Sequence, residues 1–170
     1  ISTFAALVFI VSCSQKEVTS QHQYQGFVMG TSWHVSCVSD DTTALQLDDV
    51  ISKALDEVDQ AMSTYKPDSE ISRFSRSSNG ISVSAPSFYV ISVAVDIAKQ
   101  TNGAFDPTVM PLVNMWGFGP ETNSQSAPTD SAIASAMKIC GWQHLQLSND
   151  SFFVGKDIAE LEIDLSAIAK

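Results

Sequence analysis

The chain has 170 residues and a formal net charge of −10, from nine basic and nineteen acidic residues. Its Lys and Arg residues form no cluster, which argues against nucleic acid as a partner and against electrostatic binding to a membrane surface. A chain of this length can bury a substantial hydrophobic core.

The first thirteen residues are mainly apolar and end in a cysteine, Cys13. An apolar run of about eleven residues is too short to cross a bilayer, which takes roughly 20, but it suits the core of a signal peptide. We expect residues 1–13 to be a bacterial lipoprotein signal that ends at a lipidated Cys13; a buried strand is the alternative. Residues 14–23 are polar and would form a tether, with the protein held on the periplasmic side of the cell envelope.

The segment 24–38 alternates enough to predict a strand, interrupted at Met29-Gly30-Thr31. A Gly within a strand pattern indicates a bulge or a place where a ligand approaches the backbone. From Ala44 to Met62 the apolar residues recur at helical spacing, which predicts the first helix. The acids on its opposite face should be solvated. They are Asp48, Asp49, Asp56, Glu57 and Asp59.

Capping patterns predict two further helices. Ser84 before Ala85-Pro86 marks a start, and Asn102-Gly103 an end. Residues 128–130 should open the third helix, which Gly141 closes. Segments 144–147 and 152–154 predict a hairpin, and 161–163 a last strand. Helices mixed with strands without a βαβ order predict an α+β fold in which antiparallel strands pack with helices.

Residues 103–120 contain three Gly, three Pro, two Phe and one Trp, but only one charged residue, Asp106. Neither a helix nor a strand tolerates so much Gly and Pro. We therefore expect an ordered loop that packs against the core or against a flat aromatic group. Trp116 and Phe118 could stack on a ligand ring, although core packing explains them equally well.

Four other residues suggest structural roles. Glu70 and Arg73 are three positions apart and could pair with each other. Cys37 and Cys140 are too far apart in the sequence for a zinc pair. We expect them to be buried free thiols. In an oxidising compartment a disulfide between them is the alternative, if they lie close together.

Five segments, in order, resemble the FAD:protein FMN transferases, the ApbE-like flavin transferases. They are Phe27-Val-Met-Gly-Thr-Ser32, the stretch from Met62 to Phe74, residues 103–120, Cys140-Gly-Trp142 and Asp164-Leu-Ser-Ala-Ile-Ala-Lys170. The resemblance covers residues 24–170. It implies the ApbE-like flavin transferase fold, truncated, with 24–170 as the N-terminal part of a single domain.

The resemblance also implies site residues. The matching positions are Met29, Tyr65, Ala104, Phe105, Asp106, Asp164 and Lys170 for FAD, and Ala167, through its backbone oxygen, for Mg²⁺. The other metal ligands of the family, an Asp and a Thr, would lie beyond Lys170. By spacing alone Asp164 would cap a helix and Asp106 would close a turn. No catalytic base can be named, since the histidines show no ligand spacing.

The activity implied by the resemblance is Mg²⁺-dependent transfer of FMN from FAD to a Thr hydroxyl of a target protein, with release of AMP. Family targets are subunits of Na⁺-translocating NADH:quinone reductases and Rnf-type complexes. Two alternatives stay open: a Mg²⁺-dependent FAD pyrophosphatase that forms FMN and AMP, and a non-catalytic flavin-binding lipoprotein. An Asp and a Thr at the downstream metal positions would favour the enzymes.

Replacing Cys13 tests the predicted anchor. Without its thiol the chain cannot be acylated, so Cys13→Ala should release the protein from membranes when the full chain is expressed in a bacterium. Fractionation and mass spectrometry of the N-terminus measure this, with Cys37→Ala as the control. Unchanged membrane retention with an intact N-terminal segment would contradict the prediction.

Overall fold

The computed structural model describes residues 19–120 and 126–169. The expected signal with Cys13, the first part of the expected tether and Lys170 lie outside the described residues. The elements are β1 (Ser20–Val28), β2 (Thr31–Ser39), α1 (Asp41–Met62), α2 (Glu70–Arg76), β3 (Gly80–Ser82), α3 (Ala85–Gln100), α4 (Met110–Met115), α5 (Asp130–Ala136), β4 (Leu145–Ser148) and β5 (Phe153–Lys156). Short 3₁₀ turns lie at Met137–Ile139, Trp142–His144 and Asn149–Ser151.

Helices combined with two antiparallel sheets confirm the α+β prediction. Within the described ranges, no helix has the length and apolar character needed to span a membrane.

The first strand pattern is a hairpin, not one interrupted strand. β1 and β2 pair antiparallel over their whole length. Met29 and Gly30 join them with φ values of 52° and 72°. Two successive residues of positive φ form the tight turn that reverses a hairpin, so the expected bulge is wrong. β1 also starts at Ser20, inside the segment expected to be a tether.

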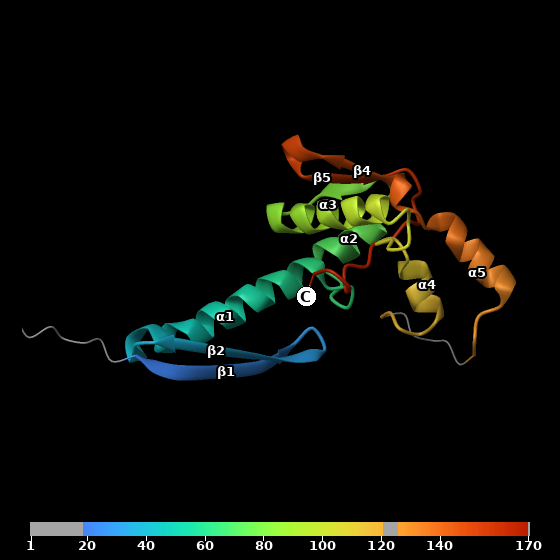
Figure 1. The fold of residues 1–170 in the computed structure, drawn as a ribbon. Coiled ribbons are helices and arrows are strands. Elements are labelled where there is room, and N and C mark those ends of the chain that lie inside the picture. Colours follow the sequence, from blue (N-terminus) through green and yellow to red (C-terminus); the bar gives the residue numbers. More distant parts are fainter. Residues whose placement is uncertain (1–18, 121–125, 170) are drawn as a thin grey trace, which may run out of the picture.

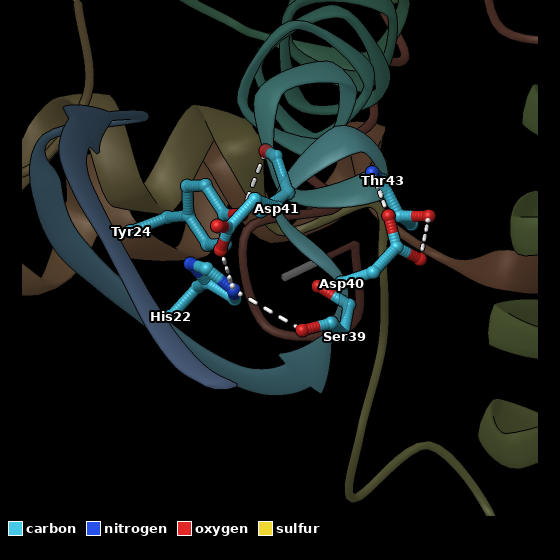
Figure 2. Close-up of polar contacts among 7 residues, drawn as sticks. His22, Tyr24, Ser39, Asp40, Asp41 and Thr43 are labelled. Carbon is cyan, nitrogen blue, oxygen red and sulfur yellow. Dashed lines mark hydrogen bonds and ion pairs between the residues drawn. The ribbon is translucent and has the colours of Figure 1, made fainter. Parts of the chain in front are cut away.

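The hairpin is fastened to the start of α1 by polar contacts (Figure 2). The Tyr24 hydroxyl donates to the carbonyl of Ala44 at 2.8 Å. Asp40 caps the helix by accepting from the backbone N–H of Thr43 at 2.9 Å and from its hydroxyl at 2.8 Å. This cap starts α1 at Asp41, three residues before the apolar pattern begins. Figure 1 shows the hairpin lying along α1, beside the body formed by the other elements.

In the body, α3 packs against a sheet with strand order β3-β5-β4 (Figure 1). The predicted hairpin at 144–154 is therefore confirmed as β4 and β5. Gly80 of β3 has a φ of 120° and lies opposite Gly155; a Cβ at Gly80 would collide with the carbonyl of Val154. The largest fully buried apolar side chains join α2, α3, β5 and the last described segment. They include Ile71, Phe74, Ile91, Val154, Leu161, Ile163 and Leu165.

The expected strand at 161–163 belongs to neither sheet, although Leu161 and Ile163 are fully buried. Its backbone is held by one side-chain contact and one loop contact instead of by a strand ladder. The Lys156 ammonium donates to the carbonyl of Leu161 at 2.8 Å. The N–H of Asp164 donates to the carbonyl of Pro107 at 2.8 Å. The apolar residues at 161 and 163 are buried, as expected, but the segment does not pair with a strand.

Capping residues set the other helix ends largely as predicted. Ser84 caps α3, and Asn102 and Gly103 follow its end with φ values of 52° and 81°. The third helix is shorter than expected, because α5 stops at Ala136 and continues as a 3₁₀ turn. The loop expected at 103–120 contains a short helix, α4, with Pro111 in its first turn, where no N–H is needed.

Glu70 has a different partner from the one predicted. Its carboxylate accepts from the backbone N–H of Ser84 at 3.0 and 3.1 Å and from the Ser84 hydroxyl at 3.0 Å. Among the described residues it forms no ion pair with Arg73. Glu70 therefore links the first turn of α2 to the start of α3, and the expected pair is wrong.

A hydrogen-bonded turn at residues 106–108, called here the 106–108 junction, joins segments far apart in the sequence. Asp106 Oδ1 accepts from the N–H of Thr108 at 2.9 Å and from its hydroxyl at 2.7 Å. Asp106 Oδ2 accepts from the N–H of Trp142 at 3.1 Å. The Thr108 hydroxyl in turn accepts from the N–H of Gly141 at 2.6 Å.

Thr108→Val should destabilise the protein, because the fully buried hydroxyl both donates to Asp106 and satisfies the N–H of Gly141. Leaving such a group unpaired costs about 1–3 kcal/mol, or roughly 2–12 °C in Tm for a chain of this size. Thermal unfolding followed by circular dichroism measures the shift. The same change at the exposed Thr42 is the control; equal melting of the two variants would contradict the assigned role.

Candidate functional site

A cavity of about 590 Å³ lies beside the hairpin turn. Its walls come from Met29 and Gly30, from the end of α1 and the loop after it, from Phe118, and from the segment 165–169. Pockets of roughly 300–1,000 Å³ are typical of small-molecule sites. Elements that are distant in the sequence therefore meet around a space large enough for a ligand.

The wall contributed by α1 carries an ion pair. Lys66 Nζ lies 2.6 Å from Asp59 Oδ2, and the Asp59 side chain is only 14% exposed. The expectation that Asp59 belongs to a solvated acidic face is therefore wrong, because the loop after α1 folds back over it. Lys66 is the only cationic residue among the described residues that line the cavity.

Two exposed aromatic residues border the cavity. The Tyr65 hydroxyl donates to the carbonyl of Phe118 at 3.1 Å, and their side chains are 66% and 76% exposed. Trp116 is also half exposed, so core packing does not account for Trp116 and Phe118. Exposed aromatic faces at a cavity suit a planar ligand. The motif comparison assigned Tyr65, whereas Phe118 was one of the two aromatic residues for which ligand stacking and core packing both stayed open.

The structure brings several predicted site residues together. Met29 and Tyr65 line the cavity, although they come from different sequence blocks. Asp164 and Ala167 belong to the turn that supplies other lining residues, Leu165, Ser166 and Ala169. Asp164 Oδ1 accepts from the N–H of Ser166 at 2.8 Å, which closes a turn within the described residues.

The other predicted residues lie elsewhere. Ala104 is exposed, Phe105 packs against the core, and both oxygens of Asp106 are engaged by backbone N–H groups. None of the three lines this cavity. Lys170 lies outside the described residues. The Asp106 carboxylate thus closes the turn that its sequence position also allows, and its contact with FAD stays a prediction.

Cys37 and Cys140 are free and half buried, so no disulfide joins them. Burial raises the pKa of the Cys140 thiol, and the carboxylates of Asp106 and Glu162 add to the rise. A raised pKa keeps the thiol protonated and poorly nucleophilic at neutral pH. Across residues 19–120 and 126–169, no three His, Cys, Asp or Glu side chains gather into a metal site.

Comparison with known proteins agrees with this geometry. The FAD:protein FMN transferase of Vibrio cholerae is 38% identical over 172 residues, which are 98% of this chain and 50% of the relative. That of Escherichia coli K12 is 35% identical over 181 residues, 100% of this chain and 52% of the relative. The solved structure of the flavin transferase ApbE from Vibrio cholerae has a TM-score of 0.81 at 38% identity, covering 90% of this chain and 50% of that one.

The chain thus spans about half the length of the curated relatives it matches. The predicted ApbE-like fold is confirmed by the solved structures. Residues 29–170 match the ApbE family. On sequence and fold together, this chain belongs to the ApbE family.

Proposed function

We propose that the protein is an FAD:protein FMN transferase, which requires Mg²⁺, attaches FMN from FAD to a Thr hydroxyl of a target protein and releases AMP. The observation that carries the proposal is the convergence of separate family-like segments on one cavity. Met29, Tyr65 and the turn that follows Asp164 are far apart in the sequence, yet all lie around the same space of about 590 Å³. The relatives' names support transfer of FMN from FAD to a protein, and the resemblance of the sequence implies Mg²⁺, the Thr acceptor and the release of AMP.

The lining of the cavity suits a flavin nucleotide. Tyr65 and Phe118 offer exposed aromatic faces on which a flat heteroaromatic ring can stack. Lys66, which is paired with Asp59, places a cation in the cavity wall, to which a phosphate would be attracted. The chain's main contribution to transfer is to hold FAD so that one phosphate faces the acceptor hydroxyl.

The turn after Asp164 fits the hard cation in the proposal. One oxygen of Asp164 is engaged by Ser166; the second oxygen, with the carbonyl of Ala167, offers the oxygen donors that Mg²⁺ prefers. Phosphate oxygens of FAD, together with the Asp and the Thr expected beyond Lys170, would complete the coordination. When bound, the ion offsets the negative charge of the pyrophosphate.

The target and the location belong to the same proposal. The acceptor would be a flavin-bearing subunit of an Na⁺-translocating NADH:quinone reductase or of an Rnf-type complex. Lipidation at Cys13 would hold the enzyme at the membrane on the periplasmic side, next to such complexes. The apolar run before Cys13 supports the anchor.

Removing an aromatic face should weaken FAD binding. Tyr65→Ala should raise the Kd for FAD by roughly two- to tenfold, because a stacked aromatic pair contributes about 0.5–1.5 kcal/mol. Tyr65→Phe keeps the ring and should bind nearly as well as the parent. Flavin fluorescence titration measures the Kd. Tyr89→Ala is the matched control, since Tyr89 is 70% exposed on α3 and away from the cavity; equal effects at both positions would contradict the assignment.

Transfer itself is tested by incubating the full chain with FAD, Mg²⁺ and a candidate acceptor subunit and detecting covalent flavin by mass. Asp164→Asn should reduce FAD binding or transfer by about tenfold to a hundredfold, since a charge-assisted contact contributes roughly 1.5–3 kcal/mol. Its melting should stay near the parent, because the Asn side chain can still accept from Ser166.

Asp150→Asn serves as the control for this experiment, because Asp150 lies in the exposed turn between β4 and β5. Lower stability of Asp164→Asn with normal turnover by its folded fraction would assign Asp164 to the turn alone. Release of FMN and AMP without any modified acceptor would replace the transferase by a pyrophosphatase. FAD binding without turnover would leave a flavin-binding protein.

A further inference from the structure

Lys156, the last residue of β5, is a buried cation. The residue is only 5% exposed. Its ammonium donates to the carbonyl of Leu161 at 2.8 Å and to the carbonyl of Ser75 at 3.1 Å, and lies 4.8 Å from the centre of the Phe74 ring. Lysines are almost never so buried unless their donors are satisfied. Here two backbone carbonyls and one aromatic face surround the charge.

Burying this amine costs free energy, because the charged form loses its contact with water, and the pKa of Lys156 is lowered as a result. The carboxylates of Glu162 and Glu160 counteract the shift. An apolar side chain of similar length would avoid the desolvation. The distinctive contribution of Lys156 is therefore its hydrogen bonds, of which the shorter is made to Leu161.

That bond is made to a segment without a sheet partner. Residues 161–165 belong to no helix and to neither sheet, yet Leu161, Ile163 and Leu165 are fully buried. Lys156 holds the segment at Leu161, and the carbonyl of Pro107 holds it at Asp164. Immediately afterwards the chain makes the turn that lines the cavity. Two polar anchors thus replace the ladder of bonds that a strand would have.

We propose that Lys156 is a positioning residue for the cavity: its ammonium fixes the start of the segment 161–169 and so sets the place of the turn that faces the ligand. The inference rests on the proposed function in so far as that ligand is FAD. Lys156 does not line the cavity, so it acts through the segment and not by contact.

The test is Lys156→Met in the full chain, which keeps the length of the side chain and removes the donor. Amide hydrogens of residues 161–169 should exchange with deuterium about tenfold faster or more, while those of α3 keep their rates, because only the local anchor is lost. The Kd for FAD should rise by about tenfold. Lys156→Gln, which retains an N–H donor, should fall between the parent and Lys156→Met.

Ile91→Val is the matched control, since Ile91 is buried in α3 and its truncation lowers stability without removing either polar anchor of the segment. It should leave exchange at 161–169 and FAD binding unchanged. Equal acceleration in α3 and in 161–169, or loss of folding in both Lys156 variants, overturns the proposal in favour of a general core role. If the parent chain binds no FAD, the proposed function fails, while the exchange comparison still decides whether Lys156 orders the segment.

Discussion

The arrangement around the cavity depends on the carboxylate of Asp106. It closes the 106–108 junction. There the Asp106 carboxylate accepts from the N–H of Trp142, the Thr108 hydroxyl accepts from the N–H of Gly141, and the Pro107 carbonyl accepts from the N–H of Asp164. These contacts connect the loop after α3 with the residues just before β4 and with the segment that leads into the cavity. Since a carboxylate accepts several hydrogen bonds at once, one side chain can hold both its own turn and the backbone at Trp142.

The junction and Lys156 complement each other. Both satisfy backbone groups that no sheet or helix satisfies, and both act on the same buried segment, at Asp164 and at Leu161. Buried backbone groups without partners are costly, so an irregular segment can be buried only with such help. An irregular segment can therefore reach the cavity through the core only because polar groups there satisfy its backbone at Leu161 and Asp164.

Local features of the fold could be predicted from the sequence, and contacts between distant segments could not. Helices α1 and α3 follow from apolar spacing and from capping residues, which act within a few positions. The reversal at Met29-Gly30 was missed because Met seldom adopts a positive φ. The partners of Asp59 and Glu70, and the absence of a strand at 161–163, depend on packing that no local pattern contains.

Met29 combines two demands that conflict. Its place in the turn requires a left-handed backbone, in which Asn or Gly would be comfortable and Met is strained. Its side chain, however, forms part of the cavity wall. The residue that would best fold the hairpin is thus not the residue that would best complete the pocket. At this one position, filling the cavity wall and stabilising the turn favour different amino acids, which is the trade-off expected where a cavity is built on a strained turn.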